Sequence, residues 1–290
     1  MEPVARLAEK ISWFPGHMYK ATKGVKENIK NIDVFLEIRD ARVPYSSRNH
    51  ELDAIIKEHN KPKVILFNKF DQCNQGQTNK VISDFTKAKI DCMALSAQQG
   101  TNIPRILQKV KELRPAKFNT VGMWMMVGGM PNVGKSTILN NLRNISKTPD
   151  TKKNVVKTGP LPCVTRGVSG FKVSEDPVMF VVDTPGIMVP RIVDEETGLK
   201  LAIVGCIKDS IVGKDILIDF LLESLNKRKA YTYVKYYGLP GPINRGHDLI
   251  EYVKDKYKHS NYEATYDLIL GNYRHGKIGR ITLDDVDMSS

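Results

Sequence analysis

The chain has 290 residues, of which 41% are hydrophobic and 26% charged, a composition typical of globular proteins with about two domains. No uninterrupted apolar run approaches the roughly 20 residues that a transmembrane helix needs, so no such helix is predicted. Lys and Arg number 44 against 32 Asp and Glu, and the net charge of +12 favours a polyanionic partner, nucleic acid first. A basic compartment would also account for this charge.

The positive charge lies in the first part of the chain, because acidic and basic residues balance at fifteen each from Arg191 to the end. One basic concentration runs from Lys147 to Lys172, and another runs from Lys20 to Lys30. The second could be a binding surface or a solvated helix face. Four scattered cysteines without a CxxC pair (Cys73, Cys92, Cys163 and Cys206) predict a reducing compartment and no zinc site.

The first strands predicted after a polar, helix-compatible stretch at 17–30 are Val34–Ile38 and Val64–Phe67. The second runs into Asn68-Lys69-Phe70-Asp71, which fits the guanine-recognition element NKxD. The Asp71 carboxylate can accept from guanine N1–H and the 2-amino group together, whereas adenine lacks this donor pair. Such a site should reject ATP by ~10⁴-fold or more. We expect Asn68 to brace the loop and the Lys69 stem to lie across the purine.

A third strand, Met93–Leu95, ends at Ser96-Ala97, about 25 residues after NKxD. In guanine-binding sites this dipeptide supplies a backbone amide to guanine O6. Because NKxD and Ser96-Ala97 both follow apolar strands, the pair is far more specific than NKxD alone.

A fourth strand, Met123–Val127, leads into a Walker A phosphate loop, Gly129 to Ser136. Backbone N–H groups of such a loop surround phosphates at the start of a helix. We expect Lys135 to reach the β- and γ-phosphates and the Ser136 hydroxyl to bind Mg²⁺. The remaining residues predicted to contact nucleotide here are Asn132, Val133, Gly134 and Thr137.

The switch elements are predicted around a fifth strand, Val178–Val182, which ends at Asp183-Thr-Pro-Gly186 and fits DxxG. Asp183 would hold Mg²⁺ through water, and the Gly186 amide would sense the γ-phosphate. Thr165, between the phosphate loop and DxxG, fits the second hydroxyl ligand of Mg²⁺. Ile187 stands where most GTPases carry a glutamine that orients water. Either hydrolysis is very slow alone, or another group positions the water.

The order of these motifs is permuted, because NKxD precedes the phosphate loop. The prediction is an α/β fold: a circularly permuted P-loop GTPase domain over residues 1–191, with a parallel-rich sheet wound on both faces. Its motifs should meet at the carboxyl ends of the strands.

A small all-helical domain is predicted over residues 192–290. Its helices are expected at Leu199–Lys208, Asp215–Arg228, His247–Lys258 and Tyr262–Leu270, with a break at 238–242 and a frayed end over 284–290. The tyrosines of this domain either stack on unpaired bases or pack a helix; those considered are Tyr231, Tyr233, Tyr236 and Tyr237.

These motifs resemble the circularly permuted ribosome-assembly GTPases, bacterial ribosome biogenesis GTPase A and its mitochondrial relatives. The resemblance covers nearly the whole chain, and residues 183–237 look closest to the mitochondrial branch. The strings that carry it outside the nucleotide motifs are Trp13–Met18, Arg39–Pro44, Arg48-Asn49, Glu196–Ala202 and Gly276–Arg280.

The resemblance implies a GTP-hydrolysing assembly factor that binds the ribosomal RNA of the large-subunit precursor of the mitochondrial ribosome. It implies His17 as the water-positioning group, beside Lys135 and Gly186 as catalytic residues, and K⁺ bound at Asn132. The expected location is the mitochondrial matrix or the matrix face of the inner membrane, with bacterial cytoplasm as the alternative. We expect a monomer away from the ribosome.

Other readings remain open. One is a GTP-dependent RNA-binding placeholder with little hydrolysis, since the glutamine is absent. Another is a peripheral membrane GTPase that uses the Lys20–Lys30 stretch on anionic lipid. An ATPase is disfavoured by Asp71.

Overall fold

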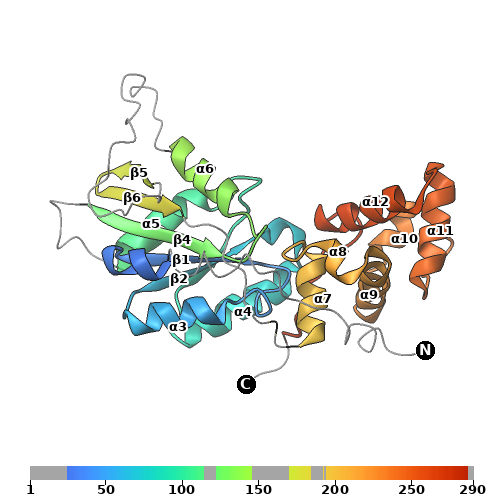
Figure 1. The fold of residues 1–290 in the computed structure, drawn as a ribbon, viewed down its shortest axis with the longest axis horizontal. Helices are drawn as coiled ribbons and strands as arrows, with labels where there is room; N and C mark the ends of the chain where they lie inside the picture. Colours follow the sequence, from blue (N-terminus) through green and yellow to red (C-terminus); the bar gives the residue numbers. More distant parts are fainter. Residues whose placement is uncertain (1–24, 114–121, 146–169, 184–191, 193, 287–290) are drawn as a thin grey trace.

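The computed structural model describes residues 25–113, 122–145, 170–183, 192 and 194–286. Its centre is a six-stranded sheet in the order β3-β2-β1-β4-β6-β5 (Figure 1). The strands are β1 (Val34–Asp40), β2 (Lys63–Asn68), β3 (Cys92–Ala94), β4 (Met123–Gly129), β5 (Gly170–Glu175) and β6 (Val178–Asp183). All neighbours pair in parallel except β5, which pairs antiparallel with β6 at the edge. The predicted parallel-rich sheet is therefore confirmed.

Helices cover both faces of this sheet. On one face, α5 (Ile103–Leu113) and α6 (Lys135–Ile145) bury apolar side chains against Leu36 and Ile38. On the other, α3 (His50–Glu58) packs on Phe35, and α4 (Gln75–Lys87) packs on β2 (Figure 1). Because successive strand side chains point to opposite faces, β1 directs Val34, Leu36 and Ile38 to the layer of α5 and α6 and Phe35 to the layer of α3, and all seven of its residues are buried.

A buried ion-pair network lies on the α3 side of β1. Arg39 donates from Nε and Nη2 to both carboxylate oxygens of Glu37, at 3.0 and 2.9 Å. Glu37 also accepts from Lys63 Nζ at 2.9 Å and from the Asn49 backbone N–H at 3.3 Å. Asn49 in turn begins α3, because its side chain accepts from the Leu52 N–H. Arg39 and Asn49, which belong to the family-like segments Arg39–Pro44 and Arg48-Asn49, therefore have a structural role in joining β1 to α3.

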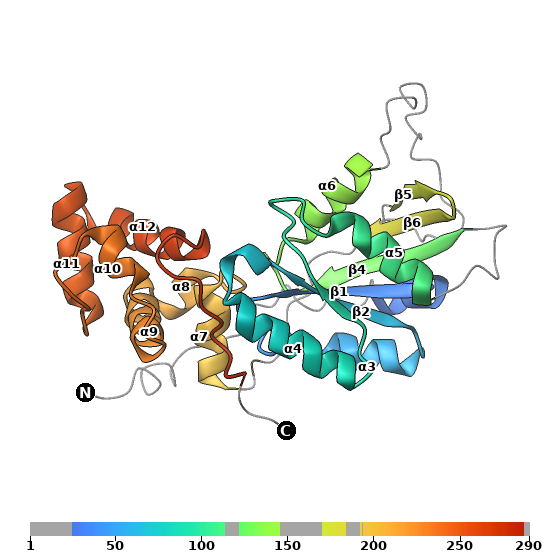
Figure 2. The same cartoon turned by 180° about the vertical axis from the view of Figure 1, so that it is seen from behind.

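The second region of the described chain is helical (Figure 2). It contains α7 (Glu195–Ile203), α8 (Asp209–Val212), α9 (Lys214–Lys227), α10 (Thr232–Tyr237), α11 (Gly246–Tyr257) and α12 (Tyr262–Arg274). None of the helices in the described ranges is both long and apolar enough to cross a lipid bilayer. The break predicted at 238–242 separates α10 from α11.

Several predicted boundaries were wrong by a few residues. Asp194 accepts from the Thr197 N–H and starts α7 four residues before the predicted Leu199, and the chain turns at Gly205 (φ 84°), so α8 is a separate helix. Residues 25–28 are helical and continue into the 3₁₀ helix η1 (Ile29–Asn31), and 17–24 lie outside the described residues. The short edge strand β5 was not predicted, although the alternation of Phe171 and Val173 with polar residues is typical of a half-buried strand.

The prediction that residues from 284 onward are frayed was wrong for the part that the structure describes. Asp284 is 4% exposed, and its carboxylate accepts from the backbone N–H groups of Tyr45 and Ser46 at 2.7 and 2.9 Å. Val286 is buried in the cluster formed by β2 and α4. The chain thus returns from the helical region to the GTPase sheet. The predicted boundary between residues 191 and 192 adjoins residues outside the described ranges and stays a prediction.

Candidate nucleotide site

The predicted motifs converge at one edge of the sheet. In the strand register Asp40 lies opposite Asn68, Ile38 opposite Gly129, and Val127 opposite Asp183. The carboxyl ends of β1, β2, β4 and β6 therefore lie side by side, as the doubly wound arrangement requires.

The phosphate loop needs glycine at its two ends because other chain segments lie so close. A Cβ on Gly134 (φ 99°) would lie 2.2 Å from Asn68 Nδ2. A Cβ on Gly129 (φ 151°) would lie 2.3 Å from the Ile38 carbonyl oxygen. The Walker A glycines thus allow the loop to curl tightly against β1 and the NKxD element.

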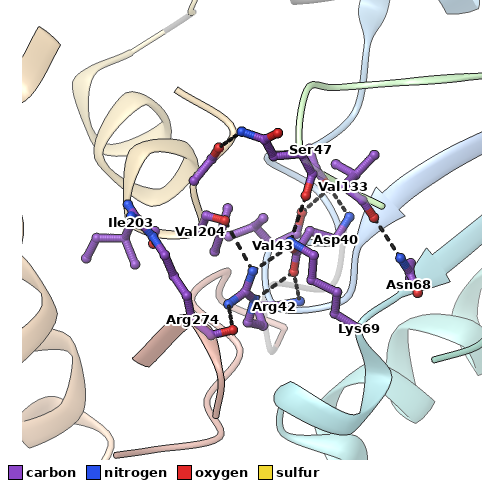
Figure 3. A network of polar contacts seen from close by, with 12 residues as sticks. Asp40, Arg42, Val43, Ser47, Asn68, Lys69, Val133, Ile203, Val204 and Arg274 are labelled. Carbon is purple, nitrogen blue, oxygen red and sulfur yellow. Dashed lines mark hydrogen bonds and ion pairs between the residues drawn. The ribbon is translucent and has the colours of Figure 1, made fainter. Parts of the chain in front are cut away.

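Asn68 joins the base-recognition elements to the phosphate loop. Its side chain is buried and donates from Nδ2 to the Val133 carbonyl at 2.7 Å (Figure 3). Its Oδ1 accepts from the Ala97 N–H at 2.9 Å. One side chain therefore holds three loops in register. This is the bracing geometry expected of Asn68.

Asp71 is the residue predicted to recognise guanine. It lies in the 3₁₀ helix η2 (Phe70–Gln72), directly beyond β2, and its Oδ1 is buried without a hydrogen-bond partner among the described residues. A buried carboxylate oxygen without a donor is costly unless a ligand supplies one. Guanine N1–H and the 2-amino group are donors of the required kind.

Lys69 crosses from the base element to the phosphate loop. It adopts a left-handed conformation (φ 62°), and its ammonium donates to the Asn132 carbonyl at 2.8 Å. It also pairs with Asp40 Oδ2 at 3.0 Å (Figure 3). The aliphatic stem is thereby held between NKxD and the phosphate loop, where the sequence predicts a purine to lie.

The residues predicted to contact phosphate open α6. Lys135 is buried, and its ammonium donates to the loop carbonyls of Met130 at 2.9 Å and Gly129 at 3.3 Å. Ser136 and Thr137 are exposed in the first helical turn. The N–H groups of this turn have no partner within the helix, so they can meet an anion.

The amides predicted to contact guanine O6 are engaged within the protein. The Ser96 N–H donates to Thr101 O at 3.2 Å, and the Ala97 N–H donates to Asn68. An O6 contact would therefore require the Ala97 N–H to be shared between Asn68 and the base.

The phosphate loop also contacts the helical region. Asn132, the residue predicted to bind K⁺, has a left-handed backbone (φ 58°), and its Nδ2 donates to the Gly205 carbonyl at 2.8 Å. Gly205 lies in the turn after α7. The nucleotide loop and the helical region are thus joined by a direct hydrogen bond.

Arg42 forms the centre of an interdomain seam, which comprises Asp40, Arg42, Val204, Tyr273 and Arg274. Its guanidinium is fully buried and pairs with both oxygens of Asp40, at 2.9 and 2.7 Å. It also donates to the Val204 carbonyl at 3.3 Å and the Arg274 carbonyl at 3.4 Å (Figure 3), and it lies 5.7 Å from the Tyr273 ring centroid.

The charges of the seam are mutually stabilising. Burial alone would raise the pKa of the Asp40 carboxyl, but Arg42 and Lys69 outweigh it and hold this pKa well below its usual range. Arg274 adds a second cation, donating to the Ala202 and Ile203 carbonyls at the end of α7 and to Asp209. Sequence reasoning missed these roles. The available signal was a polar side chain, Asp40, at the end of a buried strand, as at Asn68.

Three predicted site residues lie outside the described residues: His17, Thr165 and Gly186. Ile187 does as well. For Asp183 the structure places the backbone at the end of β6, beside the strand that leads into the phosphate loop.

Comparison with known proteins places the chain in a family. Residues 125–236 match the family described as 50S ribosome-binding GTPase. This match begins in β4, so the NKxD segment lies before it, as a permuted order requires.

Relatives and solved structures extend the likeness to nearly the whole chain. Ribosome biogenesis GTPase A of Bacillus pumilus is 33% identical, over 94% of this chain and 98% of that protein. Mitochondrial ribosome-associated GTPase 1 of Xenopus tropicalis is 33% identical, over 95% of each. Short integuments 2, a mitochondrial protein of Arabidopsis thaliana, is 38% identical over 83% of this chain, and the match spans only 63% of that longer protein.

GDP-bound YlqF from Thermotoga maritima shares the fold, with a TM-score of 0.60 and 21% identity over 90% of this chain and 97% of that one. The fold, the permuted motif order and the near-complete coverage agree. The chain is a circularly permuted GTPase, and it belongs to the ribosome-biogenesis family that includes bacterial ribosome biogenesis GTPase A and mitochondrial ribosome-associated GTPase 1.

Proposed function

We propose that this chain is an assembly factor for the large subunit of the mitochondrial ribosome, which binds ribosomal RNA and couples docking and release to GTP. Relatives named for mitochondrial and for 50S ribosomal association support the target, and the net charge of +12 suits an RNA partner. The mitochondrial matrix is the proposed location, with bacterial cytoplasm as the alternative. We also propose that the chain is monomeric away from the ribosome.

The proposed base site is Asp71 with Asn68, Lys69, Ser96 and Ala97. Asp71 accepts from guanine, Asn68 keeps its loop against the phosphate loop, and the Lys69 stem covers the purine. The buried Asp71 Oδ1 without a donor supports this assignment most directly.

The proposed phosphate site is the loop from Asn132 to Thr137. On binding GTP, the Lys135 ammonium exchanges its loop carbonyls for the β- and γ-phosphates, and the amides of Val133, Gly134 and Thr137 surround phosphate oxygens. Mg²⁺ would be held by Ser136, Thr165 and, through water, Asp183, where it would neutralise charge that develops on the phosphates. K⁺ at Asn132 is part of the same proposal.

The proposed hydrolysis depends on a water positioned by His17, since Ile187 can neither donate nor accept a hydrogen bond. Without a partner the rate should be slow, roughly 10⁻⁴ s⁻¹. The ribosome would order His17 and the Gly186 segment and so raise it.

One observation supports a coupling between the nucleotide site and the helical region. The phosphate loop is hydrogen-bonded to the helical region through Asn132 and Gly205, and the base element reaches the same region through Lys69, Asp40 and Arg42. A change in nucleotide can therefore alter how the helical region is held.

The test is GTP turnover in potassium buffer, with and without large ribosomal subunits, for the unaltered chain and His17→Ala. Strong stimulation that is lost in His17→Ala would support the proposal, and stimulation kept in it would move the water-positioning role to another group. Asp71→Asn is the control for the base site, because it should shift preference from GTP toward XTP.

Absence of stimulation despite tight GTP binding would contradict the proposal and leave a GTP-dependent RNA-binding placeholder. Liposome co-sedimentation at physiological salt separates these readings from a peripheral membrane GTPase or attachment to the inner membrane.

A further inference from the structure

The tyrosines of the helical region divide into buried and exposed side chains. Tyr233 and Tyr237 are fully buried, so for these two the packing alternative holds. Tyr236 and Tyr257 are 38% and 42% exposed, although large apolar rings are usually covered. These two exposed rings need a separate explanation.

The exposed rings belong to one cluster at the ends of α10 and α11. Tyr236 and Tyr257 both contact the buried Tyr237 edge-to-face, with ring centroids 5.1 and 6.5 Å away. His259 extends the cluster, 6.0 Å from Tyr257. We call Tyr236, Tyr237, Tyr257 and His259 the tyrosine platform.

Hydrogen bonds hold Tyr236 and Tyr237 of the platform in place. The Tyr236 hydroxyl donates to Asn272 Oδ1 at 3.4 Å, and Asn272 Nδ2 donates to the Tyr237 hydroxyl at 3.1 Å. Lys256 donates to the Tyr237 carbonyl and covers the end of α10. Rings fixed in this way lose little conformational entropy when a ligand stacks on them.

The charge beside the platform is positive. Lys235, Lys256 and Lys258 are exposed around it, and the sequence 254–258 carries three lysines against one carboxylate, Asp255. Phosphates of a strand whose bases meet the rings would lie within reach of these lysines.

Another exposed tyrosine of the same region, Tyr262, differs in that its ring face and hydroxyl are already engaged by a lysine, a tyrosine and a carboxylate of the chain itself. Tyr262 is 45% exposed, but its hydroxyl donates to Glu251 at 2.7 Å, and Lys254 lies 4.8 Å from its ring centroid. Its ring also stacks on Tyr266, with centroids 6.2 Å apart. Glu251 thus engages the Tyr262 hydroxyl, and Lys254 and Tyr266 engage its ring, so Tyr262 is an exposed tyrosine that serves as a matched control.

We propose that Tyr236 and Tyr257, with the adjacent lysines, stack unpaired bases of a single-stranded RNA segment. This inference rests on the proposed RNA-binding function and names the surface that performs it. Aromatic rings accept any base that is not stacked in a duplex, and lysines attract the backbone without reading sequence. The surface should therefore prefer single strands to duplexes.

The experiment measures binding of a labelled oligoadenylate, and of a duplex of equal length, to the full chain by fluorescence anisotropy. In the doubly substituted Tyr236→Leu/Tyr257→Leu chain, affinity for the single strand should fall about fivefold or more per ring. Affinity for the duplex should change by less than about twofold. In Tyr262→Leu, affinity for the single strand and affinity for the duplex should both change by less than about twofold. Lys235→Gln should lower the slope of log affinity against log salt concentration for the single strand by about one, which corresponds to one phosphate contact.

Phenylalanine variants separate stacking from folding. Tyr236→Phe/Tyr257→Phe keeps both rings and should retain affinity, and GTP binding in every variant reports that the chain is folded. If the leucine variant keeps its affinity for the single strand, or loses affinity equally for the strand and the duplex, the proposal that the tyrosine platform stacks bases is wrong. The proposed RNA-binding function would still stand. Failure of the unaltered chain to bind either RNA, or precursor subunits, would overturn both.

Discussion

The helical region meets its surroundings in two unlike ways. At the interdomain seam, the Arg42 guanidinium is fully buried. It pairs with the nearby Asp40 carboxylate and donates to two carbonyls from distant parts of the chain. On the outward surface, cations such as Lys214 pair with carboxylates while remaining in water. A buried charge tolerates only one arrangement of its partners, whereas an exposed pair can be broken at little cost. The seam therefore sets how the two regions are joined, and the outer surface stays available to ligands.

The largest effect is expected from Arg42→Met. This change leaves Asp40 buried without its guanidinium and should lower the free energy of unfolding by ~3–5 kcal/mol. Chemical denaturation measures it. Combining Arg42→Met with Asp40→Asn should recover part of the loss, because the uncompensated carboxylate is then gone. A loss below ~1 kcal/mol in the single variant would mean that the seam contributes little.

An intermediate effect is expected on acidification. The pKa values of Asp40 and Glu37 are both lowered in the folded chain: burial opposes ionisation, but Arg42 and Lys69 at Asp40, and Arg39 and Lys63 at Glu37, favour it more strongly. A lowered folded-state pKa adds stability above the unfolded value, about 4, that is lost as the pH falls below it. Unfolding free energies from about pH 6 to 3 should therefore fall steeply.

The same titration distinguishes the two carboxylates. In Arg42→Met the Asp40 contribution should be missing and the acid dependence shallower, while Glu37 continues to contribute. Equal slopes in both proteins would show that Asp40 does not drive the acid response.

The smallest effect is expected from Lys214→Ala on the outer surface. Lys214 pairs with Glu263 and Asp267 at 2.7 Å each, yet both carboxylates are largely exposed and screened by water. The melting temperature of the variant should lie close to that of the unaltered chain, and this small difference should change little when salt is added. A loss comparable with that of Arg42→Met would remove the contrast between seam and surface.

Local pattern was enough to predict the nucleotide elements. Asn68, Gly134 and Asp183 each follow an apolar strand, and parallel strands bring such loops to one edge irrespective of side-chain detail. The Ser96-Ala97 amides show the limit of this reasoning. The motif predicts that they contact guanine O6, but only the fold shows that the Ala97 N–H already donates to Asn68.

Burial of the tyrosines could not be read from sequence. Tyr236 and Tyr237 are neighbours in α10, and consecutive helical residues point about 100° apart, so one can be buried while the other is exposed. Which of them is buried depends on Asn272 and Tyr257, which come from other helices.

The sequence by itself determined the order of the motifs, the sheet that carries them and the guanine-binding chemistry, because each depends on residues close together in the chain. Tertiary structure alone decided the interdomain seam and the return of Asp284 to the GTPase sheet. Arg42 meets Val204 across 162 residues and Arg274 across 232. Contacts of that separation depend on how the two regions are placed in the folded chain, and no local periodicity encodes them.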